Sequence, residues 1–204
     1  WVERTSTRFT FNVKAHALLT GHRTDPSRLP RSVRSLLDVR ALGMASIDAA
    51  DLSPEALHAV RDAFSAFVTP LRDAGRLGTV LFQYPPWFVP SDRAAATLDA
   101  IRHDFPTLPV AVEFRNTAWG EPVAFREATA QLRALAMAYV AVDAPRGITT
   151  AMPPIDAVTD PGMAILRLHG RNAAAWEARH SSAPNPIQLE KVTVELRATT
   201  VTMK

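Results

Sequence analysis

The sequence lacks cysteine, and this absence excludes disulfide bonds, thiolate nucleophiles and thiolate metal sites. It also lacks any apolar run close to the roughly 20 residues that cross a bilayer, and it has no signal-like start. We therefore expect a cytoplasmic protein with no membrane partner. A large excess of one sign of charge is also lacking, because 23 Lys and Arg are nearly balanced by 20 Asp and Glu. The resulting net charge of +3 is too small to favour nucleic acid as the partner.

Glycine is also scarce, with 8 residues in 204, and no Gly-rich turn of the P-loop or dinucleotide-binding type follows an apolar segment. This argues against a nucleotide-binding fold, and we expect no cofactor. What is present is a hydrophobic fraction of 47%, which suits one globular domain with a real core. We expect a single domain over residues 1–204, cut at both ends, because strand-like segments lie close to Trp1 and to Lys204.

Short apolar segments alternate with helix-like stretches along the chain. Helix start signals are Ser53 before Pro54, Ser91 before Asp92, and Pro122, and a weaker helix is predicted over Gln188 to Leu196. Between Arg23 and Asp51 the chain makes an excursion too long for an ordinary loop. This alternation predicts an α/β fold with a mainly parallel sheet, either doubly wound or closed into a (β/α) barrel. The five predicted strands are Phe9–Ala15, Thr79–Gln83, Val110–Arg115, Ala138–Asp143 and Ala164–His169.

Polar and charged residues stand at the carboxyl ends of these predicted strands, where a covered parallel strand should be apolar. Several recur at a spacing of two, which places them on one side of their strand. Residues from the carboxyl ends of several strands form the active sites of (β/α) barrels, so we expect these side chains to converge. They are Lys14 and His16, Gln83, Glu113 and Arg115, Asp143, and Arg167, His169 and Arg171.

The cations in this set outnumber the carboxylates, which predicts an anionic small-molecule ligand. We assign Glu113, His169 and Asp143 as catalytic, with Glu113 as acid or base and His169 as proton shuttle. The predicted substrate-binding residues are Lys14, His16, His22, Gln83, Arg115, Trp119, Arg167 and Arg171.

Two other interpretations of these residues stay open. Glu113 paired with Arg167 or Lys14 would serve as an internal ion plug without activity. A metal site has suitable ligand types but no diagnostic spacing, and the nearby cations oppose it, so we assign no metal. The residues Trp87, Trp119 and Trp176 follow strand ends and act either as stacking platforms, which would be exposed, or as caps of the core, which would be buried.

The order of motifs resembles domain of unknown function family 72, the YecE-like proteins. The resemblance rests on residues 11–16 (FNVKAH), 19–22 (LTGH), 77–86 (LGTVLFQYPP), 112–115 (VEFR) with Trp119, 142–145 (VDAP) and 167–171 (RLHGR). It implies a TIM-barrel-like fold with these motifs at successive strand ends, and it implies no particular reaction. The family's first two strands and its last strand have no counterpart here, so the resemblance implies an incomplete barrel.

Our leading hypothesis is an enzyme that acts on a phosphorylated or sugar-like anion. One alternative is a nucleic-acid-binding or metal-dependent phosphodiesterase-like barrel, with a phosphate-contacting rim of Arg23, Arg28, Arg31, Arg34 and Arg40. The other alternative is that the protein is a non-catalytic binding module. The sequence does not indicate an oligomeric state.

Overall fold

The computed structural model describes residues 1–170, 172–174 and 176 and the backbone of the strand at 192–196. Two compact units make up the chain. Unit 1 comprises Trp1–Pro85 and Ile101–Val110, and unit 2 comprises Pro86–Ala100 and Ala111 onward. Each unit is described by itself.

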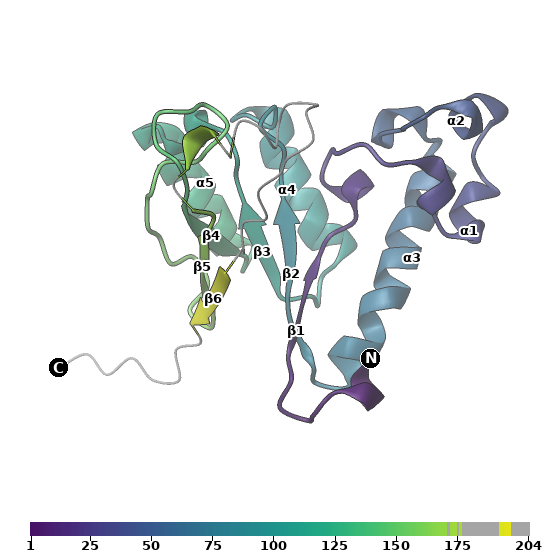
Figure 1. The fold of residues 1–204 in the computed structure, drawn as a ribbon, viewed down its shortest axis with the longest axis horizontal. Helices are drawn as coiled ribbons and strands as arrows, with labels where there is room; N and C mark the ends of the chain where they lie inside the picture. The colour runs from purple at the N-terminus through teal and green to yellow at the C-terminus, as the bar shows by residue number, and fades with distance from the viewer. Residues whose placement is uncertain (171, 175, 177–191, 197–204) are drawn as a thin grey trace. The chain divides into compact units, whose positions relative to one another are not determined.

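Unit 1 is built on two parallel strands, β1 (Phe11–Lys14) and β2 (Leu77–Gln83), which lie side by side in Figure 1. The long helix α3 (Pro54–Asp73) connects them after the excursion. It begins where the sequence predicts, because Ser53 caps it by accepting a hydrogen bond from the Ala56 N–H and Pro54 occupies the first turn. The apolar stripe of α3 packs toward β2, with Phe64 and Phe82 both in contact with Phe105.

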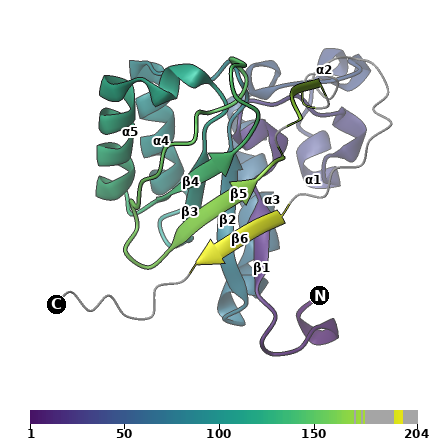
Figure 2. The same cartoon turned by 60° about the vertical axis from the view of Figure 1, so that its left-hand side comes forward.

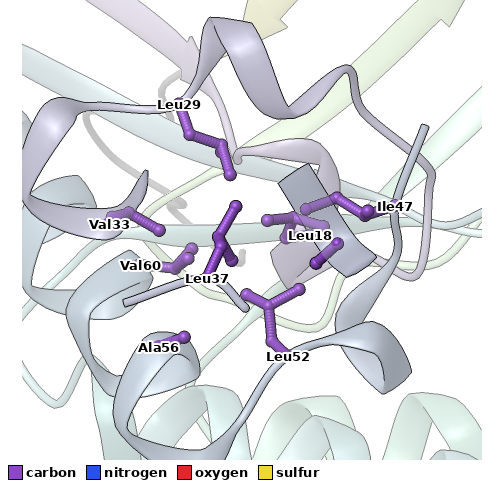
Figure 3. Close-up of a cluster of buried hydrophobic side chains, with 9 residues drawn as sticks. Leu18, Leu29, Val33, Leu37, Ile47, Leu52, Ala56 and Val60 are labelled. Atoms are coloured by element: carbon purple, nitrogen blue, oxygen red, sulfur yellow. The ribbon is translucent and has the colours of Figure 1, made fainter. Parts of the chain in front are cut away.

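The excursion before α3 forms a small lobe of short helices with a hydrophobic core (Figure 3). Leu18, Val33 and Ile47 are buried in it together with Val60 from α3. Asp25 and Asp38 cap two of its helices through backbone N–H groups, which explains why a segment rich in polar residues is nevertheless ordered. The helices are η2 (Ala17–Leu19), η3 (Pro26–Arg28), α1 (Arg31–Arg34), α2 (Val39–Gly43) and η4 (Ala49–Asp51), and η1 (Val2–Arg4) precedes β1.

Unit 2 carries β4 (Ala138–Asp143), β5 (Ala164–Leu168) and all of β3 (Val110–Glu113) except its first residue, and these strands pair in parallel in sequence order. Helix α4 (Asp92–Asp104) precedes β3, and η5 (Thr117–Gly120) and α5 (Pro122–Ala134) connect β3 to β4. The Gln131 amide of α5 donates to the Ala95 carbonyl and to Asp99 of α4, which holds these two helices together. The side of β4 that carries Tyr139 packs against Phe125 of α5.

The helix predicted over Gln188 to Leu196 is wrong where the structure describes it. Val192–Leu196 form strand β6, which pairs antiparallel with β5 (Figure 2). The Val-Thr-Val run at residues 192–194 consists of β-branched residues, which favour strands over helices, and the exposed edge of β5 supplies the partner. β-Branching is therefore the sequence signal that agrees with the structure in this segment.

In both units each parallel strand pairs with a strand that neighbours it in sequence. Helical segments lie in the connections from β1 to β2 and from β3 to β4, whereas β4 is joined to β5 without a helix. This order is typical of a (β/α) barrel and differs from that of a doubly wound sheet. All five predicted parallel strands are present within a few residues of their expected bounds. None of the helices in the described part of the chain combines the length and the apolar composition needed to cross a membrane.

Candidate functional site

Glu113 is the last residue of β3, a strand that is buried along its whole length, and the Glu113 side chain has no solvent exposure. The carboxylate is held from two strands. Oε1 accepts a hydrogen bond from Nε of Arg115 at 2.9 Å, and Oε2 accepts one from Nη1 of Arg167 on β5. Nε2 of His169 lies 3.3 Å from Oε1. We call Glu113, Arg115, Arg167 and His169 the Glu113 cluster.

The sequence places these groups together through strand alternation and register. Glu113 and Arg115 are two residues apart, as are Arg167 and His169, so each pair lies on one side of its segment. Arg167 pairs in register with Val142, and the His169 N–H continues the ladder by donating to the Asp143 carbonyl at 2.8 Å. The ion pair between Glu113 and Arg167 that the sequence left open is therefore present.

The cluster is electrostatically unusual because its charges are almost completely desolvated. The side chains of Arg115 and Arg167 are 13% and 11% exposed. Burial by itself would raise the pKa of Glu113, but His169, Arg115 and Arg167 together outweigh it and hold that pKa well below its usual range. Glu113 is consequently a permanent anion at neutral pH.

His169 is buried, and burial lowers its pKa, opposed by Glu113 and assisted by the two arginines. The ring is therefore neutral at pH 7. Its Nε2 contacts Oε1 of Glu113 at 3.3 Å, and its Nδ1 has no hydrogen-bond partner among the described residues. A buried polar atom without such a partner costs free energy.

Trp176 covers the cluster from one side. The guanidinium carbon of Arg115 lies 5.0 Å from the centre of the Trp176 ring, and the His169 ring lies 5.5 Å away, edge to face. Nε1 of Trp176 donates to the Thr150 hydroxyl, which fixes the indole against the segment after β4. The sequence singled out Trp176 only as a cap or platform, and its contact with Arg115 carries no local sequence signal.

Asp143 contacts the Glu113 cluster through its backbone carbonyl, because this carbonyl accepts the hydrogen bond from the His169 N–H. Its side chain alternates with that of Val142, which is paired with Arg167, and shares the strand side of Tyr139, which packs on Phe125. Alternation therefore points the Asp143 carboxylate away from the Arg167 side of the strand. The catalytic role expected for Asp143 stays a prediction.

Four predicted substrate-binding residues belong to unit 1. Lys14 and His16 line a cavity with Arg28, and His22 contacts the Thr20 hydroxyl through Nδ1 at 2.8 Å. Gln83 ends β2 and is buried. Sequence reasoning did not connect Arg28 with Lys14 and His16, because the excursion brings it there from a separate segment.

Trp119 is 4% exposed, stacks on Phe114 and donates its indole N–H to the Phe88 carbonyl, so it has the buried position of a cap. Trp87 is 66% exposed, as a platform would be. Arg171, the remaining predicted binding residue, lies outside the described residues.

The arginines of the proposed nucleic-acid rim lie in the lobe of unit 1. Arg23 is paired with Asp48 at 2.6 Å and with Asp51 at 3.5 Å, which offsets its charge.

Across the described part of the chain no three His, Asp or Glu side chains are grouped as metal ligands would be.

Parallel strands in sequence order, with buried charges at their carboxyl ends, define an α/β protein of the (β/α) barrel class. The chain belongs to the family described as Protein of unknown function DUF72, whose family model matches residues 1–202. The resemblance drawn from the strand-end motifs is thereby confirmed.

Relatives of known structure share this fold. A DUF72 family protein from Enterococcus faecalis V583 (EF0366) is 27% identical, with a TM-score of 0.68 over 88% of this chain and 61% of that one. A DUF72 family protein from Thermotoga maritima MSB8 (TM1631), at 24% identity, has a TM-score of 0.61 over 87% of this chain and 55% of that one, and supports the fold alone.

Among curated proteins, UPF0759 protein YunF from Bacillus subtilis (strain 168) is 27% identical over 176 residues, which are 86% of this chain and 54% of the relative. The chain thus spans little more than half the length of this relative.

Proposed function

We propose that unit 2 binds an anionic small molecule at the Glu113 cluster, with Arg115 and Arg167 as ligands of the anion and His169 as the group that exchanges a proton with it. Phosphate esters and carboxylates are the suitable classes, because a guanidinium fork matches their paired oxygens. The observation that carries this proposal is the charge balance. Among the described residues, the ion pairs of both guanidinium groups run to one carboxylate.

A pure ion plug would be expected to neutralise its own charges, since an uncompensated buried charge is costly. Two guanidinium groups on one carboxylate leave an excess of one positive charge, and His169 adds none while it is neutral. A bound anion would complete the balance and would supply a partner to Nδ1 of the imidazole.

The low pKa of Glu113 changes the role that we assign to it. A carboxyl group that stays ionised far below neutral pH is a weak proton acceptor, whereas general acid–base catalysis works best with a pKa near the working pH. Glu113 is therefore proposed as a positioning residue that fixes the two guanidinium groups. The neutral imidazole of His169 is the better proton carrier.

The test is titration of the protein with inorganic phosphate and with glucose 6-phosphate, followed by calorimetry. We expect saturable binding that Arg167→Met weakens by at least about tenfold, since a hydrogen bond to a charged group contributes about 1.5–3 kcal/mol. Arg126→Met is the matched control, because Arg126 lies exposed on α5. Arg167→Lys keeps the charge and loses the fork, so it should also bind more weakly while it remains folded.

Two results would contradict the proposal: no saturable phosphate binding, or equal binding by the wild type and both Arg167 variants. A salt series separates the nucleic-acid alternative. Counterion release makes nucleic-acid binding fall steeply with salt, and a small anion with few charge contacts shows a shallow slope.

A further inference from the structure

Unit 1 contains a cavity of about 320 Å³ that is separate in its residues from the Glu113 cluster. One wall is a face of α3, where Val60, Phe64 and Phe67 recur at intervals of four and three residues. Leu29 and Val33 from the lobe also line the cavity. This volume lies at the lower end of the range for pockets that hold small molecules, about 300–1,000 Å³.

The apolar wall of this cavity consists largely of packed core side chains. Leu29, Val33 and Val60 belong to the buried core of the lobe shown in Figure 3. Phe64 is buried and packs edge to face on Phe105 at 5.7 Å. An apolar wall made of packed core side chains is preorganised, so a ligand that enters does not have to order it.

The polar lining of the same cavity is basic. Lys14 ends β1, His16 follows it directly, and Arg28 ends η3. No acidic residue appears among the described residues that line the cavity. The acid beside Arg28 is Asp25, which is itself occupied in capping η3 through the Ser27 N–H at 2.8 Å.

His16 adds a directional donor to this lining. Its Nδ1 accepts a hydrogen bond from the Leu18 N–H at 3.3 Å, and burial lowers its pKa, so the ring is neutral at pH 7. In a neutral imidazole whose Nδ1 is an acceptor, Nε2 carries the hydrogen. The site therefore offers two cations and one neutral N–H donor around an apolar interior.

We propose that this cavity binds a small carboxylic acid whose body is about one aromatic ring in size, with the carboxylate at Lys14, Arg28 and His16 and the ring against Phe64 and Val33. A monoanion suits the site better than a dianionic phosphate, because less charge has to be desolvated next to the apolar wall. This site uses none of the residues of the Glu113 cluster.

The test is a calorimetric titration with phenylacetate, paired with methyl-resonance shifts of Val33 and Val60. We expect binding to one site with a dissociation constant of about 1 mM or lower, which about ten non-hydrogen atoms can supply. The neutral analogue phenylacetamide should bind at least about tenfold more weakly, as should phenylacetate to the double variant Lys14→Met/Arg28→Met.

Three further variants make the result specific. Arg40→Met removes an exposed arginine of the same lobe that does not line the cavity, and it should leave phenylacetate binding unchanged. Ala63→Phe places a ring in the cavity and should abolish binding, with folding checked by thermal unfolding. Arg167→Met, which tests the Glu113 cluster, should not alter phenylacetate binding.

The inference is overturned if phenylacetate shows no saturable binding, if the double variant binds it as well as Arg40→Met does, or if the amide binds as tightly as the acid. Because Lys14 and Arg28 are exposed, their replacement should leave the fold intact.

Discussion

In unit 2 two guanidinium groups converge on one fully buried carboxylate, whereas in unit 1 Lys14 and Arg28 stand exposed at the rim of an apolar cavity. Burial makes the first arrangement a part of the core, so removal of one of its charges leaves the others buried without their partner and destabilises the fold. The side chains of Lys14 and Arg28 in the second arrangement are exposed to solvent, where charge interactions are weak. The cationic side chains of these two arrangements are therefore buried ion-pair partners in unit 2 and exposed groups in unit 1.

The largest loss of stability is expected when the buried carboxylate of the Glu113 cluster in unit 2 is removed. Glu113→Gln keeps the shape of the side chain but leaves two buried guanidinium groups without their carboxylate. We expect the free energy of unfolding to fall by about 3–5 kcal/mol, the usual loss when one partner of a buried ion pair is removed. Urea denaturation at pH 7 measures this.

Glu127→Gln, on the exposed side of α5, is the control and should change stability by less than about 0.5 kcal/mol. If both variants lose equal stability, the buried charges of the Glu113 cluster are no more important for the fold than an exposed carboxylate.

The pH dependence of stability supplies a second readout of the same variant. The folded pKa of Glu113 lies below its ordinary value of 4.5, so its contribution is fully present above pH 4.5 and is lost as the pH falls. Wild type should therefore lose stability more steeply than Glu113→Gln below pH 4.5. The lowered pKa of His169 acts in the same direction below its ordinary value of 6.5, in both proteins.

A somewhat smaller loss of stability is expected for a variant in the hydrophobic core of unit 1. Leu18→Ala removes a buried side chain of the lobe and should cost about 2–5 kcal/mol through lost burial and a cavity. No titratable group is altered, so the loss should be the same at pH 5 and pH 8. Leu36→Ala, at an exposed position of the same lobe, should cost much less. A strongly pH-dependent loss in Leu18→Ala would remove the contrast between the two units.

The smallest effect concerns the start of α3, which carries one wall of the cavity. Ser53→Ala deletes the cap on the Ala56 N–H and should lower the free energy of unfolding by about 1 kcal/mol. Ser65→Ala, within the same helix, should be neutral or slightly stabilising, because alanine has the higher helix propensity. Thermal unfolding of the two variants should therefore give shifts of opposite sign or shifts that differ clearly in size.

Most of the fold could be predicted because its signals are local. Ser53, Ser91 and Pro122 mark helix starts, and the apolar runs before Gln83 and Asp143 mark strands. The segment 192–196 was predicted as a helix although its β-branched run favours a strand, and its partner, the edge of β5, comes from another segment.

The candidate site was predicted in part. The spacing of two correctly placed Glu113 with Arg115 and Arg167 with His169, and register brought these two pairs into one cluster. Asp143 shows the limit of that reasoning, because its position in the alternation directs its side chain to the opposite strand face from Arg167. The cavity in unit 1 was missed because Arg28 and Phe64 lie in different segments, and no pattern in either one predicts their meeting.

The sequence by itself determined the α/β class, the strand-end positions of the charged residues and their excess of positive charge, since all three follow from local composition and periodicity. Tertiary structure alone decided which charges became buried partners and which stayed at a cavity rim. Burial and register depend on contacts between distant segments, and these set both the pKa of Glu113 and the walls around Lys14.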